Sequence, residues 1–302
     1  MKILIFISLF VLTLNAKTIT PNEVYAQTVL IAQHIESLLK HYEIPYNTKK
    51  LKKETAIFTK LKPRNAWQNA YEILVKINVL RGEYGLPRIE PIGMEPVEHL
   101  NPDMVYEMTQ RILVEIKIFE VRQNIVVPHF KVKKFKYKTP LDVYNNFSYI
   151  SALFDKLNGS ELSPSYVFAS TMRIYNDITL ILHHLKIRDN TVPSKKLKSA
   201  TPNDSLNVAL QVLNKIKKLQ SMAGIQTIDS SVFKKKNAKP SDVYTVTGLI
   251  LAELQPIKAY IGLIHSVTPP PLRFENKIPA DIEQLMGWNL KRISLIRSLN
   301  KR

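Results

Sequence analysis

A short motif recurs about eight times along the chain and constrains the fold more than any other feature. The clearest copies read Thr-Pro-x-Asp-Val-Tyr or a close variant and occupy residues 20–25, 139–144 and 239–244. Weaker copies begin at Pro63, Pro102, Pro164, Pro202 and Pro279. A unit repeated in this way buries its apolar face only against neighbouring units, so the repeat determines the architecture.

An apolar stripe with helical periodicity follows each proline. With the proline as position one, apolar residues recur at positions 4, 11, 15 and 18, which are Val24, Ile31, Ile35 and Leu38 in the first copy. Such spacing places the apolar side chains on one helix face. The sequence therefore predicts an all-α protein with eight long helices. Position five is aromatic in six copies, and we expect these side chains in the core: Tyr25, Trp67, Tyr106, Tyr144, Phe168 and Tyr244.

The motif also predicts where each helix begins. Proline suits the first helical position, because its φ angle is preset and no backbone donor is lost there. Hydroxyl side chains directly before the proline are expected to act as N-caps, at Thr20, Thr139, Ser163 and Thr201. Carboxylates at position three are expected to complete a capping box, at Glu23, Asp142, Asp204, Asp242 and Asp281.

The spacing of the prolines divides the chain into two halves. Pro140 and Pro164 are 24 residues apart, whereas the other successive prolines are separated by 38 to 42 residues. We therefore predict two tandem four-helix bundles joined near residue 160, one over residues 17–159 and the other over residues 160–302. Connectors of about 14 residues reach about 45 Å when extended, and a 22-residue helix is about 33 Å long. Both parallel and antiparallel helix orders therefore remain open.

The N-terminus has the pattern of a secretory signal peptide. Lys2 precedes an apolar stretch over residues 3–14, and Ala16 stands before the polar Lys17. Because this stretch is shorter than the about 20 residues of a membrane-spanning helix, we predict a signal peptide over residues 1–16 with cleavage after Ala16. An uncleaved anchor is the alternative. We expect a periplasmic or secreted protein with no transmembrane span after signal removal.

Composition limits the partners and the chemistry. The chain has no cysteine and a formal net charge of +18. Disulfides, thiolate metal sites and cysteine nucleophiles are thereby excluded. For an exported protein, this charge favours an anionic envelope component or an acidic protein as partner, and we expect no nucleic acid.

Four lysine runs in the connectors carry much of the charge. We predict partner contacts at Lys49, Lys50, Lys52, Lys53, Lys131, Lys133, Lys134, Lys136, Lys138, Lys195, Lys196, Lys198, Lys234, Lys235 and Lys236. Each run precedes a helix start, where positive charge opposes the helix dipole, so local helix stability does not explain the runs. If the copies stack in register, the runs converge on one basic face. Solvated loops without a partner are the alternative.

Three positions depart from a regular helix pattern. Pro256 is expected to kink or end the seventh long helix, and Gly248 and Gly287 are expected to mark close packing or an opening.

No motif argues for catalysis, and we expect no catalytic residue, cofactor or metal site. The P-loop, the dinucleotide fingerprint and the His-Glu-x-x-His pattern are missing. His34 and His41 lie seven residues apart on one helix face, which leaves a haem or metal bundle as a minor alternative. The sequence favours an exported, non-enzymatic helical-bundle scaffold or binding protein of the cell envelope that docks through a basic connector face. A periplasmic small-molecule or sensory ligand-binding module is the alternative.

Overall fold

The computed structural model describes residues 18–89 and 100–299. The predicted signal peptide lies outside these ranges. Within them the protein is all-helical, with nine α-helices, one 3₁₀ turn and no strand. The long helices are α1 (Pro21–His41), α3 (Pro63–Glu83), α4 (Pro102–Arg122), α5 (Pro140–Leu157), α6 (Pro164–His184), α7 (Pro202–Met222), α8 (Pro240–Tyr260) and α9 (Pro279–Ile293). Two short elements, α2 (Thr48–Thr55) and η1 (Ser231–Phe233), lie in connectors.

The fold class predicted from the repeat is confirmed, because each of the eight long helices begins at a motif proline. The hydroxyls of Thr20, Thr139 and Thr201 accept backbone N–H groups of the first turn. All five position-three carboxylates accept the backbone N–H of the residue before the proline, at 2.7–3.0 Å. The prediction for Ser163 is wrong, because its side chain makes no cap hydrogen bond.

A common stop signal, which sequence reasoning missed, ends six of the long helices. The residue at position 23 has a positive φ angle of 54–89° and is Glu43, Gly85, Asn124, Lys186, Gly224 or Gly262. The next backbone N–H then reaches back five residues, as in the 2.8 Å bond from Ile44 to the Leu39 carbonyl. This bond belongs to the Schellman motif, which satisfies a carbonyl at the helix end. An isoleucine or leucine occupies position 24 in all six helices.

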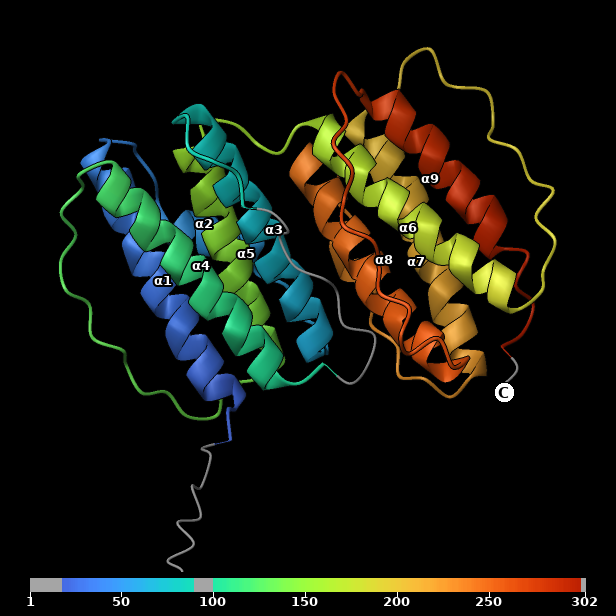
Figure 1. The fold of residues 1–302 in the computed structure, drawn as a ribbon, viewed down its shortest axis with the longest axis horizontal. Coiled ribbons are helices and arrows are strands. Elements are labelled where there is room, and N and C mark those ends of the chain that lie inside the picture. The colour runs from blue at the N-terminus through green and yellow to red at the C-terminus, as the bar shows by residue number, and fades with distance from the viewer. Residues whose placement is uncertain (1–17, 90–99, 300–302) are drawn as a thin grey trace, which may run out of the picture.

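The long helices form two bundles with the same topology (Figure 1). In the first bundle, α1 and α3 each pack against both α4 and α5. In the second bundle, α6 and α7 each pack against both α8 and α9. The first and second long helices of each bundle thus lie diagonally opposite each other, and so do the third and fourth, whereas the second and third are neighbours. This shared arrangement supports a duplicated four-helix unit.

The helices within each bundle run parallel, which resolves the order left open by the sequence. In the first bundle, contacts advance together along α1 and α5, from Thr28 with Asn146 to Glu36 with Tyr149. In the second bundle they advance along α6 and α8, from Ser170 with Thr247 to Asp177 with Lys258. The connectors therefore return along the length of each bundle, as Figure 1 shows for those before α5 and α7.

Polar pairs join the parallel helices at a repeated register. In the first bundle, His34 at position 14 of α1 contacts Glu120 at position 19 of α4, 2.7 Å away. The equivalent pair in the second bundle is Asp177 of α6 and Lys258 of α8, at 3.0 Å. Two more pairs join positions 14 and 19. Glu115 of α4 pairs with Arg81 of α3, and Glu253 of α8 pairs with Gln220 of α7. Because the helices of the repeat run parallel, positions 14 and 19 of neighbouring helices lie at nearly the same level.

The two bundles meet where α3 packs against α8, and this pair is antiparallel. Asn65 at the start of α3 donates to Glu253 in the second half of α8, at 2.8 Å. Glu72, further along α3, accepts a bond from Thr245 near the start of α8, at 3.0 Å. Gly248 lies at this joint, because a Cβ atom there would stand 3.5 Å from Gln68. The chain passes from α5 to α6 through residues 158–163, which turn the corner between the bundles.

At two of the irregular positions the structure excludes one of the two outcomes expected from the sequence. Helix α8 continues past Pro256 to Tyr260, so the proline does not end it. Gly287 does not mark close packing, because the nearest atom to an added Cβ would be Glu283 Oε1 at 4.0 Å.

The core follows position four more closely than position five. All eight residues at position four are buried, from Val24 to Ile282. The aromatic residues at position five divide into two groups. Those on the helices near the joint, Trp67, Tyr144 and Tyr244, are buried. The other three, Tyr25, Tyr106 and Phe168, are half-buried.

Candidate functional site

The structure places the four lysine runs in two different settings and does not gather them on one face. The runs at residues 131–138 and 195–198 lie in the connectors on opposite sides of the molecule (Figure 1). Phe135 of the first packs edge-on against Tyr25 of α1, and Lys196 of the second is 2.7 Å from Asp281 of α9. These two runs therefore cover the outer helices of separate bundles.

The other two runs border one cleft between the bundles. The run at residues 49–53 lies on α2, which packs against α5. The run at residues 234–236 directly follows Phe233, whose ring contacts that of Tyr144 on α5 at 6.5 Å between centroids. Lys50 and Lys235 both line this cleft. Segments almost two hundred residues apart in sequence thus bring positive charge to the same opening.

We name this opening the polar cleft and define it by the side chains Lys50, Glu72, Tyr144, Ser151, Asp155, Glu161, Lys235, Ser241 and Thr245. Its volume is about 1260 Å³. Helices α2, α3 and α5 provide the wall from the first bundle, and η1 with the start of α8 provides the wall from the second. A site at a boundary between two packed units is a common location for ligand binding.

A buried charge network forms the floor of the polar cleft. Glu72 is 3% exposed and accepts bonds from Ser151 Oγ at 2.6 Å and Thr245 Oγ1 at 3.0 Å. Lys76 Nζ is fully buried behind it, 2.6 Å from Asp155 and 2.8 Å from Ser151 Oγ. Because buried charges are costly unless they are paired, these bonds hold the floor in one geometry.

The pKa of the Asp155 carboxyl is raised well above its ordinary value. Burial raises the pKa of Asp155 to about 6, and the neighbouring Lys76 ammonium offsets only part of that rise. Its side chain is 21% exposed and lines the polar cleft. The charge at the floor therefore depends on pH in the mildly acidic range.

Apart from Asp155 Oδ1, which is ion-paired with Lys76, three buried polar atoms of residues that line the polar cleft have no hydrogen-bond partner within the protein. They are the Tyr144 hydroxyl, the Ser241 hydroxyl and Glu161 Oε2. The Tyr144 side chain is 2% exposed. Because most buried polar atoms in proteins are paired, these atoms indicate where water or a ligand completes the bonding. No sequence motif marks these residues, although Tyr144 belongs to the position-five series.

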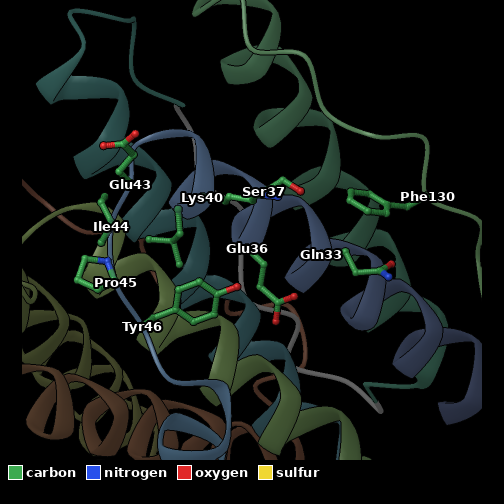
Figure 2. Close-up of a pocket in the computed structure, with 10 residues that line it drawn as sticks. Gln33, Glu36, Ser37, Lys40, Glu43, Ile44, Pro45, Tyr46 and Phe130 are labelled. Atoms are coloured by element: carbon green, nitrogen blue, oxygen red, sulfur yellow. The ribbon is translucent and has the colours of Figure 1, made fainter.

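A shallower hollow of about 540 Å³ adjoins the polar cleft and shares Pro45 and Tyr46 with it (Figure 2). The hydroxyl of Tyr46 and the carboxylate of Glu36 point toward one another in this view. Glu36 also accepts a 2.6 Å bond from Tyr149. Burial, with a smaller contribution from Glu36, raises the pKa of Tyr46. The hollow is thus a lateral extension of the same polar surface.

A second cleft, of about 910 Å³, lies between α3, α6 and the connector before α9. Basic side chains that were absent from the predicted lysine runs line it: Arg88, Arg173, Arg273 and Lys277. Arg173 is 2% exposed, donates to the Pro269 carbonyl at 3.1 Å and stacks over the Tyr71 ring. We refer to it as the basic cleft.

The two histidines considered as haem or metal ligands, His34 and His41, lie in different surroundings. His34 is buried and bonded to Glu120, whereas His41 is exposed at the end of α1 beside Tyr42. Among the residues that the structure describes, no group of three or more histidine, aspartate or glutamate side chains is placed to hold a metal ion.

Comparison with protein-family models, curated proteins and solved structures gives no match for this chain. Within residues 18–89 and 100–299, no helix has both the length and the apolar character needed to cross a membrane.

Proposed function

We propose that the protein is an exported, non-enzymatic binding protein of the cell envelope and that its ligand is anionic. The observation that carries this proposal is the polar cleft, whose opening receives lysines from two runs that are distant in sequence. A ligand that spans the cleft contacts both runs at once, so its affinity exceeds what either run provides alone.

The polar cleft has lysines at its opening and carboxylates at its floor. The exposed lysines, among them Lys50 and Lys235, attract an anion, while the carboxylates beneath them are already engaged by cations or hydroxyls. Lys239 is 2.6 Å from Glu161, and Lys76 is 2.6 Å from Asp155. Lys50 lies 3.9 Å from Glu54 in an exposed ion pair, which is weak in water, so both outer lysines remain open to a partner.

Neutralisation of one run tests the proposal. Lys234, Lys235 and Lys236 are exposed, and replacing all three by glutamine should weaken binding to purified envelope fractions at least tenfold at low salt. Raising the salt concentration from 0.05 M to 0.3 M should weaken the wild type in the same way, because exposed charges are screened.

The chain offers a matched control. Lys131, Lys133 and Lys134 are equally exposed but lie on the far side of the first bundle, so their triple glutamine variant has the same net charge. Equal losses in both variants would show that net charge alone drives binding and would contradict a role for the polar cleft.

The basic cleft favours a second candidate function, a small-molecule binding module for a compact anion. Citrate or phosphate should then raise the melting temperature, and Arg273→Gln with Lys277→Gln should abolish that increase. An unchanged melting temperature with either anion would remove this candidate.

A further inference from the structure

The floor of the polar cleft has a chemistry that its outer lysines do not explain. A simple anion-docking surface needs cations at its opening and no specific groups beneath them. The floor nevertheless presents hydroxyl and carboxylate oxygens in a continuous strip, in which hydrogen bonds run from the Ser241 backbone carbonyl through Thr245 and Glu72 to Ser151. Glu161 extends the strip through its ion pair with Lys239.

The unpaired atoms of this strip define what a ligand must supply. Glu161 Oε2 is an acceptor and needs a donor, whereas the hydroxyls of Tyr144 and Ser241 can donate or accept. A ligand hydroxyl group meets both needs because it donates and accepts at the same oxygen. Carboxylate or phosphate groups alone supply acceptors only, so they leave Glu161 Oε2 without a donor.

The size and the aromatic lining indicate the form of the ligand. At about 1260 Å³ the polar cleft exceeds the about 300–1,000 Å³ that encloses a drug-sized molecule. Tyr46 and Phe233 add ring surface to the same lining, which suits the apolar faces of a chain of rings. The dimensions therefore fit several linked units better than one compact anion.

We propose that the polar cleft binds an acidic glycan, a sugar chain whose hydroxyls bond to the floor and whose anionic groups meet the lysines at the opening. This inference rests on the proposed function and names its ligand class. The sugar hydroxyls complete the bonding of Tyr144, Ser241 and Glu161, while Lys50 and Lys235 hold the acidic substituents.

Two conservative variants test the floor without removing a bond on which the fold depends. Tyr144→Phe and Ser241→Ala each delete a hydroxyl that has no partner in the protein. Each should weaken glycan binding about threefold to tenfold, as expected for one lost hydrogen bond. Each should also leave the urea midpoint of the free protein unchanged or raised, since an unsatisfied buried group is removed. A lowered midpoint with unchanged binding would assign these hydroxyls to the fold and overturn the inference.

Three probes of matched length separate the inference from the proposed function. Isothermal titration of the full chain with an oligogalacturonate, a neutral malto-oligosaccharide and an oligoglutamate should give tight binding for the first only. If oligoglutamate binds as tightly as oligogalacturonate, the proposed anion-binding function stands but the inference of a glycan ligand is overturned. Binding of the neutral sugar as tight as that of the acidic one would overturn the role of the lysines, and hence the proposed function. Failure of all three probes would overturn both.

Discussion

The two bundles share one topology but differ in the chemistry of their equivalent polar pairs. In the first bundle the first helix supplies His34 and the third supplies Glu120. In the second bundle the first helix supplies the acid, Asp177, and the third supplies the cation, Lys258. The repeat thus determines which positions meet, and the identity of the two side chains varies freely as long as they complement each other.

The bundles also differ in what covers the third helix. The outward face of α8 packs on α3, with Thr245 and Gly248 in the contact. The outward face of α4 is solvent-exposed and carries Val114, Ile118 and Val121, which are 53%, 39% and 74% exposed. Burial of the third helix is therefore a property of the joint and not of the repeat.

The largest change in the free energy of unfolding is expected for a substitution in one of the equivalent buried polar pairs. Lys258→Met leaves the fully buried Asp177 without its cation and should lower the free energy of unfolding by about 3–5 kcal/mol. The equivalent change in the first bundle, Glu120→Gln, retains a hydrogen-bonding group for His34 and should cost about 0.5–1.5 kcal/mol. Urea unfolding measures both. Equal costs would show that the reversed pairs are energetically alike, and recovery in Asp177→Leu with Lys258→Met would verify the cause.

The pH dependence should come from the first bundle. Asp155 occupies position 16 of α5, and its counterpart in the second bundle is Ser294. Because the pKa of Asp155 is raised from 3.8 to about 6, the folded state binds more protons than the unfolded state between these values. Stability should therefore fall as pH rises through this window, by about 2–3 kcal/mol relative to Asp155→Asn. Urea unfolding from pH 4 to pH 7 measures this difference, and parallel pH curves for the two proteins would contradict it.

A smaller difference is expected between two helix starts on either side of the corner. Thr139→Ala should lower the free energy of unfolding by about 1 kcal/mol, because the Thr139 hydroxyl caps α5. Ser163→Ala should have almost no effect, since the Ser163 side chain makes no cap bond at α6. Thermal unfolding compares the variants, with Asp242→Ala as a second cap deletion of similar size. A large loss for Ser163→Ala would mean that its hydroxyl bonds elsewhere.

The smallest effect concerns two of the helical glycines, Gly248 and Gly287. Gly287→Ala should raise stability by about 0.5–1 kcal/mol, because helix propensity improves and the added methyl group would meet only Glu283 Oε1, at 4.0 Å. Gly248→Ala should gain less, since its methyl group would contact Gln68 at 3.5 Å across the joint. Urea unfolding measures both variants. A larger gain in stability for Gly248→Ala than for Gly287→Ala would show that the joint accommodates the methyl group without strain.

The repeat made the helices, their starts and the division near residue 160 predictable. Helix direction was not predictable, because connectors of that length reach either end of a neighbour. Ser163 matched the pattern of a cap but carries no carboxylate partner at position three, where Tyr166 stands. The absence of that acid was the available signal.

The polar cleft was only partly accessible to sequence reasoning. Lys50 and Lys235 belong to predicted lysine runs, but nothing in the sequence showed that two runs meet while the other two do not. Glu72 contacts Thr245 of the second bundle, so its burial depends on the joint, whereas Lys76 is buried against Ser151 and Asp155 of α5. A signal was present in the ionisable residues at positions 14 and 19 of otherwise apolar helices, where side chains such as Asp177 and Lys258 require partners.

The parallel order within each bundle has an electrostatic consequence. The four helix dipoles of a bundle point the same way, so they add to a large axial moment and repel one another sideways. Because α3 and α8 run in opposite directions, the second bundle points against the first, and the two moments oppose each other. Because the second bundle is reversed relative to the first, each end of the molecule carries helix N-termini from one bundle and helix C-termini from the other. A single parallel bundle would instead have one positive and one negative end.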